Sequence, residues 1–352
     1  MQIGLDQLSV KLENLTTTQR QIVAALYEGI VIGQEEQIDA SFSAGQGETR
    51  ELIEKLSPLL EKNSAVKFGP WQEIAFSEIA RASLDYEVNG EMVLAERWQR
   101  NVHIDQLDKT GLLLAKSLLS AGVGQVMTHD DGLVLNTDLG ELGYPKSMKS
   151  QKRISSAAEV FAQLSLPQGN RLLNLNLSAN KTQKVSLAVV VGHLALNPRT
   201  YSRWLSRDVP HLAITYELDK AWVSPLIVPG QAACLNCIQE LAVDENIDWP
   251  IIASQLLDLP RFRDDAAALL TCVGLATRTI LRKLDELAGF KTKREGQDEY
   301  LSGYRINYSS GSIDRVFYQR HALCSCSSFN RETLESDSVN SLDRFQHLSL
   351  DN

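Results

Sequence analysis

The sequence lacks a long apolar run. Its strongest run, from Leu187 to Val191, is far too short to span a bilayer. The N-terminus has neither the basic segment nor the apolar stretch of a secretory signal. We therefore expect a cytoplasmic protein without a membrane partner. The 352 residues are 43% hydrophobic and 22% charged, which excludes a disordered or low-complexity chain and, at ~150 residues per domain, suggests two domains.

The sequence is also short of positive charge and of cysteine. Lys and Arg number 35 against 44 Asp and Glu, a net charge of -9, which argues against a nucleic-acid partner bound by bulk electrostatics. Five cysteines in a cytoplasmic chain do not indicate a disulfide framework. Cys272 lies within an apolar helical pattern, which favours a place in the core.

The other four cysteines form two close pairs. Cys234 and Cys237 follow a Pro-Gly turn as C-x-x-C, and Cys324 and Cys326 follow a predicted hairpin as C-x-C. Zinc prefers four such ligands in a tetrahedron, and four thiolates would leave no open position, so the site would be structural. Three alternatives stay open: unrelated reduced thiols, a redox C-x-x-C, and His321 as a substitute ligand.

Residues 1–62 contain two short alternating segments followed by three helical patterns, which predicts a small winged-helix-like α+β module. Its third helix has an apolar face that includes Leu52, Leu56 and Leu59. The same helix is acidic on its other face, which is unfavourable for a DNA-recognition helix. The expected elements are strands over Gln2–Leu5 and Ser9–Leu12, and helices from Thr16, over Glu35–Ala40 and over Glu48–Glu61.

The remainder divides into three further segments. Residues 63–97 are interpreted as a connector, with a helix over Ile79–Leu84 and extended chain over Met92–Ala95. Residues 98–329 show an α/β pattern, and the Ser- and Asp-rich residues 330–352 predict a flexible tail. The expected strands are Val102–Ile104, Gln125–Thr128, Val185–Val191, His211–Tyr216, Trp222–Val228, Tyr304–Tyr308 and Ile313–Tyr318, and the expected helices are Gly111–Ser120 and Arg263–Leu287.

The loop after the first of these strands lacks the glycines that let a phosphate approach backbone N–H groups. Only Gly111 is present at this junction, and Asp105 and Asp108 stand where phosphates would lie. Asp130 ends the next strand, where a ribose-binding acid would fall, although a solvated carboxylate is an equal alternative. His103 and His129 end neighbouring strands and are expected to approach each other, but nothing pairs them with a nucleophile, so we name no catalytic residue.

The order of these parts resembles the ThiF/MoeB-type, ubiquitin-activating-enzyme-like superfamily. Within it, the chain is most similar to the cyclodehydratase or precursor leader-peptide-binding branch of azoline (bacteriocin-type) peptide biosynthesis. The resemblance implies a Rossmann-type nucleotide-fold domain with a four-cysteine zinc knuckle behind the winged-helix-like module. It rests on TGLLLAKSLLSAGVGQVMTHDD (110–131), SPLIVPGQAACLNC (224–237), Asp248-Trp249-Pro250 and His321-x-x-Cys324-x-Cys326.

The sequence departs from the family pattern where ATP would bind. Besides the missing glycines, Glu141 lies in the region that supplies an Arg in adenylating members, and Gly192-His193 replaces an Asp. Lys152 or Arg153 retains the basic position of the crossover segment. These departures predict a degenerate nucleotide site, of which Gly111 and Asp130 are the surviving parts.

The resemblance therefore implies a non-catalytic scaffold that binds a precursor leader peptide and presents it to a YcaO-type cyclodehydratase. The peptide would add to the edge of the N-terminal hairpin and contact Leu52, Leu56 and Leu59. Structural zinc is the implied cofactor, and a homodimer is the default assembly. The alternative is an active adenylyltransferase that uses ATP and Mg²⁺ on a ubiquitin-like or peptide C-terminus.

Overall fold

The computed structural model describes residues 2–5, 8–28, 33–60, 75–164, 172–177, 183–257, 259, 265–291 and 301–326. The chain divides into two compact units, Met1–Val66 and Lys67–Asn352, and each is described by itself. The expected tail, residues 330–352, lies outside the described residues. No helix among the described ranges is long and apolar enough to cross a membrane.

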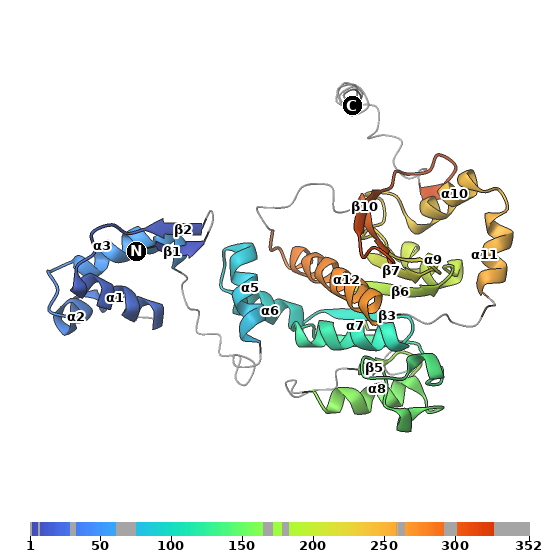
Figure 1. The fold of residues 1–352 in the computed structure, drawn as a ribbon, viewed down its shortest axis with the longest axis horizontal. Helices are drawn as coiled ribbons and strands as arrows, with labels where there is room; N and C mark the ends of the chain where they lie inside the picture. Colours follow the sequence, from blue (N-terminus) through green and yellow to red (C-terminus); the bar gives the residue numbers. More distant parts are fainter. Residues whose placement is uncertain are drawn as a thin grey trace, which may run out of the picture. The chain divides into compact units, whose positions relative to one another are not determined.

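The first unit contains a hairpin followed by three helices, in the order expected from the sequence (Figure 1). Its core gathers buried side chains from the end of β2 and from the helical segments, among them Leu12, Ile22 and Leu52. The elements are β1 (Gln2–Leu5), β2 (Leu8–Lys11), α1 (Thr17–Glu28), α2 (Glu35–Ser41), α3 (Glu48–Leu56) and the 3₁₀ turn η1 (Ser57–Leu59).

Local side-chain chemistry fixes where these helices begin and end. Thr16 and Gln19 form a reciprocal capping box, in which each backbone N–H donates to the other's side-chain oxygen, at 3.0 and 3.1 Å. The buried Asp39 carboxylate accepts from the backbone N–H of Thr49 at 2.8 Å and so caps α3. The prediction that α3 continues to Glu61 was wrong: α3 ends at Leu56 and changes to η1, where the proline at position 58 has no backbone N–H to continue the helical hydrogen bonds.

The segment expected as a connector contains two packed helices of the second unit, α5 (Phe76–Tyr86) and α6 (Gly90–Trp98). The prediction of extended chain over Met92–Ala95 was wrong, because burial there follows helical spacing and the Asn89 side chain caps α6 by accepting from Glu91 N. Arg97 of α6 forms two 2.7 Å hydrogen bonds with the buried Asp285 carboxylate. This ion pair joins α6 to α12 (Ala266–Leu287).

An eight-stranded sheet forms the centre of the second unit, in the order β10-β9-β8-β7-β6-β3-β4-β5. The run from β7 to β5 is parallel, and β8, β9 and β10 add antiparallel strands at one end. β8 ends at Val223, before Pro225, and so is shorter than predicted. The strands are β3 (Asn101–Ile104), β4 (Gln125–Thr128), β5 (Leu172–Asn174), β6 (Leu187–His193), β7 (His211–Tyr216), β8 (Lys220–Val223), β9 (Ser302–Asn307) and β10 (Ile313–Phe317).

Helices cover both faces of this sheet (Figure 1). One face packs against α7 (Lys109–Ser120), α8 (Arg153–Ala162) and α12. The other face packs against α9 (Pro198–Leu205) and α10 (Leu235–Glu245), and α11 (Trp249–Leu257) lies beside α10. Short 3₁₀ turns, η2 (Asn136–Asp138) and η3 (Lys146–Met148), follow β4. The expected first residue of the long helix, Arg263, lies outside the described residues, and the Asp265 side chain caps its observed start.

The strand order reverses between β3 and β6. The connection after β3 passes through α7 on one face, whereas the connection after β6 passes through α9 on the other. In open α/β sheets, such a switch point leaves a crevice at the carboxyl ends of the two strands, where ligands bind. The residues after β3, β4 and β6 therefore form the first place to look for a site.

Candidate functional site

The loop after β3 is bound to the rest of the protein through its own backbone. The N–H of Leu107 donates to the Asp130 carboxylate, with 2.6 Å between N and Oδ2. The Leu107 carbonyl accepts from the Tyr144 hydroxyl, also at 2.6 Å. Both hydrogen bonds are buried. Leu107 thus has no free backbone group to offer a phosphate.

Asp130, predicted at the ribose-acid position, is only 8% exposed. Its second carboxylate oxygen accepts from Gly132 N at 2.8 Å, and Arg153 Nη1 lies 3.5 Å from Oδ2. Arg153 also donates from Nε and Nη2 to Asp138, at 2.9 and 2.7 Å. Lys152 is exposed, so Arg153 is the basic residue of this segment that reaches the site.

Arg153 thus forms ion pairs with two buried carboxylates, those of Asp130 and Asp138. Burial opposes its charge, but Asp138 and the neighbouring carboxylates Asp108 and Asp130 outweigh burial and raise the pKa of Arg153 above its ordinary value. The guanidinium is therefore charged at every physiological pH. We call the set of Leu107, Asp130, Asp138, Tyr144 and Arg153 the internal network.

Asp108 and Gly111 stabilise the start of α7. The Asp108 side chain caps the helix by accepting from Gly111 N at 3.0 Å, and its other oxygen lies 3.0 Å from His193 Nε2. A Cβ on Gly111 would lie 1.9 Å from the Gln106 carbonyl oxygen. Gly111 is therefore required for close packing of the helix on the loop, a sufficient reason for glycine there without a phosphate.

Asp105 is buried below the same loop. Its Oδ1 accepts from Val191 N at 3.0 Å, whereas Oδ2 has no hydrogen-bond partner within the described part of the chain. Burial raises the pKa of Asp105 to about 7, against the effect of the Val191 hydrogen bond.

The expected approach of His103 and His129 is confirmed, with 2.9 Å between His103 Nε2 and His129 Nδ1.

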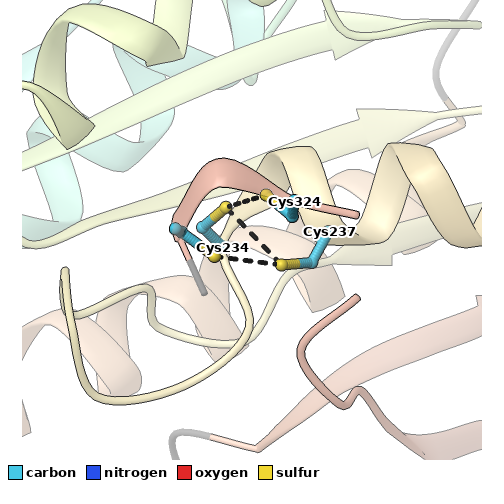
Figure 2. Close-up of side chains that lie close together, drawn as sticks. Cys234, Cys237 and Cys324 are labelled. Carbon is cyan, nitrogen blue, oxygen red and sulfur yellow. Dashed lines mark hydrogen bonds between the residues drawn. The ribbon is translucent and has the colours of Figure 1, made fainter. Parts of the chain in front are cut away.

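The four paired cysteines come together on the face that carries α10. Cys234 stands at the N-terminal end of α10 and Cys237 lies in its first turn, while Cys324 comes from the chain after β10 (Figure 2). Cys326 follows Cys324 two residues later. All four sulfur atoms lie within 4.8 Å of one another, and three pairs are 3.8, 3.6 and 3.3 Å apart. Zn–S bonds of about 2.3 Å in a tetrahedron give S–S edges of about 3.8 Å. This cluster could hold a metal ion, and its donors fit zinc.

The thiols also show the electrostatics of a cluster that cannot ionise freely. A hydrogen bond with Cys237, together with burial, raises the pKa of Cys234 far above the ordinary value, and burial raises the pKa of Cys324 to about 11. The same hydrogen bond lowers the pKa of Cys237 to about 4. Without a cation, the cluster thus favours one thiolate, and a bound cation would be needed to ionise all four cysteines.

The geometry bears on two of the alternatives for these cysteines. His321 lies outside this cluster: its Nε2 lies 2.9 Å from Asp244 and its Nδ1 accepts from Leu323 N. The interpretation as two unrelated thiol pairs was wrong. Cys272 is fully buried in α12, which confirms its place in the core.

The leucines expected to contact a peptide differ in exposure. Leu52 and Leu56 are only 2% and 3% exposed and belong to the core of the first unit, so neither offers a surface to a partner. The reason is that α3 presents its apolar face to α1 and the end of β2. Leu59 packs on the edge of this core and is partly buried.

Sequence reasoning missed the internal network. Three of its members lie in a short 3₁₀ turn, in a loop and at the start of a helix: Asp138, Tyr144 and Arg153. Their spacing of 6 and 9 residues matches no motif. One available signal was the occurrence of two aspartates, Asp130 and Asp138, close in sequence to a basic residue at the crossover position.

Comparison with known proteins supports the fold. No family model and no curated protein matches the sequence. Among solved structures, E. coli MccB with ATP matches with a TM-score of 0.61 and 14% identity over 92% of this chain and 94% of that one. The microcin C7 biosynthetic enzyme MccB in complex with N-formylated MccA gives 0.62 and 15% over the same shares. PaaA gives 0.63 and 14% over 91% and 96%.

These similarities establish the architecture. The second unit, with its eight-stranded mixed sheet covered on both faces, matches the Rossmann-type fold of ThiF/MoeB-like proteins, as the sequence resemblance predicted. At 14–16% identity the likeness speaks to fold alone.

Proposed function

We propose that this protein is a non-catalytic ThiF-like scaffold that binds a precursor leader peptide and presents it to a YcaO-type cyclodehydratase or another modifying partner. The observation that carries the proposal is the internal network. In a ThiF-like fold, ATP needs free backbone N–H groups after β3 and a free carboxylate after β4. Here Leu107 and Asp130 are bonded to each other, and Arg153 neutralises the carboxylates.

Charge supports the same conclusion. Asp105 is buried below the loop that would meet the triphosphate, and Asp108 ends that loop at the start of α7. Glu141 lies in the region that resembles the arginine-bearing segment of adenylating members. Carboxylates near the phosphates would repel them. Gly111 and Asp130, the surviving positions of the nucleotide site, have structural roles that do not need a nucleotide.

A polypeptide partner is supported by the structural neighbours. MccB is described with N-formylated MccA and with selenomethionine-labelled MccA, so its partner is itself an amino-acid chain. For this protein we propose that the peptide adds as a strand to the β1–β2 hairpin of a winged-helix-like module. Leu59, the partly exposed member of the three leucines, is the residue of that set able to contact it.

Zinc is the proposed cofactor, held by Cys234, Cys237, Cys324 and Cys326. Four thiolates would complete its coordination, so the metal would crosslink the start of α10 to the segment after β10 and take no part in chemistry. The crosslink would join Cys234 to Cys324, 90 positions apart in the chain, and would hold the C-terminal segment on the sheet. A homodimer is the proposed assembly.

The second candidate is an ATP-dependent adenylyltransferase that acts with Mg²⁺ on a ubiquitin-like or peptide C-terminus. One finding favours it: a protein of the same fold, MccB, has been crystallised with ATP and with AMPCPP. The two candidates make opposite predictions about affinity for the nucleotide.

Isothermal titration of the zinc-assayed protein with Mg-ATP separates them. The scaffold predicts about one zinc per chain and no heat of binding up to millimolar ATP. Binding in the micromolar range would overturn the scaffold and lead directly to pyrophosphate exchange with candidate peptides. As a control, the same titration is done with the Lys152→Met variant, which alters an exposed residue beside Arg153 and leaves the internal network intact.

A further inference from the structure

The chain has a net charge of -9, yet α9 and the turn after it carry three arginines at four-residue spacing, Arg199, Arg203 and Arg207. Arg199 and Arg207 are exposed, and Arg203 is partly buried. Tyr201 and Trp204 of the same helix are buried against the sheet. The arginines therefore form a basic face on an otherwise acidic protein, which we call the α9 arginine face.

The α9 arginine face has no anionic partner within ion-pair distance in the part of the chain that the structure describes. Arg203 instead lies over the Trp204 ring, 4.5 Å from its centre, and its Nε is buried without a hydrogen-bond acceptor. Burial lowers the pKa of Arg203, Asp105 opposes this effect and Arg207 adds to it. Asp105 is a weak counter-ion, because with a pKa of about 7 it carries only part of a charge near neutral pH.

The positive field of this face reaches two further elements. His129, after β4, has its pKa lowered by burial and then by Arg203 and Arg207, so these three side chains share one region. Asn176, after β5, donates its side-chain amide to the His129 carbonyl at 3.0 Å and borders the same region. Neither neighbour adds a negative charge to the partial charge of Asp105, so the arginines keep a net positive field in this region.

We infer that the α9 arginine face, Arg199, Arg203 and Arg207, docks an extended acidic segment of the polypeptide partner. Four residues of helix rise about 6 Å. Alternate residues of an extended chain are about 6.6 Å apart. Carboxylates two positions apart can therefore meet the guanidinium groups of Arg199 and Arg203, which are four residues apart in α9, and Arg207 extends the basic face in the turn after the helix.

Charge complementarity favours this occupant over nucleic acid. A chain of net charge -9 repels a long polyphosphate, whereas a short acidic segment contacts only the local basic face. The inference rests on the proposed function for the nature of the partner, a polypeptide. It adds a second contact between that polypeptide and this protein, on α9 of the second unit, besides the contact proposed for the hairpin of the first unit.

The probe is a fluorescein-labelled octapeptide of alternating Ser and Glu, titrated with the full chain by fluorescence anisotropy at low and at 0.3 M salt. The test variant is R199E/R207E, which changes two exposed arginines and should fold normally by circular dichroism. The matched control is K146E/K149E, which makes the same charge change on two exposed lysines at η3. The inference predicts binding by wild type and control, at least 10-fold weaker binding by R199E/R207E, and loss at high salt.

Equal binding by both double variants, or no binding by the wild type, would overturn the inference. Tighter binding of polyuridylate than of the peptide, lost in R199E/R207E, would assign the face to nucleic acid and also overturn it. Conversion of a wild-type dimer to monomers by R199E/R207E, seen by light scattering, would assign it to a second copy of the chain. The nucleotide titration is a separate measurement, so ATP binding would refute the scaffold without changing these outcomes.

Discussion

Removal of the Arg153 guanidinium is the most informative perturbation of the internal network. Arg153→Met keeps most of the side-chain length and its apolar stem but leaves Asp130 and Asp138 without their cation. Both carboxylates are almost fully buried, at 8% and 1% exposure. Asp130 would keep the N–H donors of Leu107 and Gly132, whereas Asp138 would lose two hydrogen bonds from the guanidinium.

The magnitude follows from these contacts. Breaking a buried ion pair from one side costs about 3–5 kcal/mol, because an uncompensated charge is left in the interior. We expect Arg153→Met to lower the free energy of unfolding by about 3–4 kcal/mol at pH 7.

Urea denaturation followed by circular dichroism measures the difference, with Lys152→Met as the matched control. The control removes an exposed neighbouring charge and should change stability by less than about 0.5 kcal/mol. A double variant, Arg153→Met with Asp138→Asn, should recover part of the loss because one buried charge is gone. A loss of under about 1 kcal/mol for Arg153→Met would refute the idea that the network holds the loop closed.

Three further predictions concern the surroundings of this network. The pKa of Asp105 is raised to about 7 from 3.8, so the folded protein disfavours the charged form, and this residue lowers the free energy of unfolding as pH rises from about 4 through 7. Asp105→Asn should abolish about 4 kcal/mol of that decline, measured by urea denaturation across this pH range. An unchanged pH profile would contradict this prediction. Gly111→Ala should lower the free energy of unfolding by about 1–3 kcal/mol, because its Cβ would meet the Gln106 carbonyl oxygen at 1.9 Å; a neutral effect would show that the loop yields easily. Cys234→Ser should reduce bound zinc well below one per chain by elemental analysis and lower the melting temperature, whereas Cys272→Ala should keep the metal; equal zinc in both variants would disprove the assigned ligands.

The sequence predicted the parts of the fold that depend on short-range patterns. Buried parallel strands such as β6 and β7 are nearly continuous apolar runs, and the capping pair Thr16 and Gln19 marked the start of α1. The cysteine pairs predicted a cluster of four, since two close pairs at turns can meet without strain. In each case, residues close together in the sequence are enough to predict the element or the cluster.

The features that the sequence did not predict depend on long-range packing. Met92–Ala95 contains β-branched and apolar residues that suit a strand, but the position of Arg97 opposite Asp285 favours the helix. The internal network joins segments up to 46 residues apart, from Leu107 to Arg153, through a few hydrogen bonds and ion pairs. Such bonds leave no periodic trace, so only the folded structure reveals them.

The central claim is that the switch-point loop is closed by the protein's own groups. Hydrogen–deuterium exchange of the segment containing residues 105–111, with and without millimolar Mg-ATP, tests it most directly. The account predicts slow exchange of the Leu107 amide, which donates to Asp130, and no change on addition of nucleotide. Rapid exchange that becomes slow with Mg-ATP would show an open loop that binds the nucleotide, and it would contradict the account.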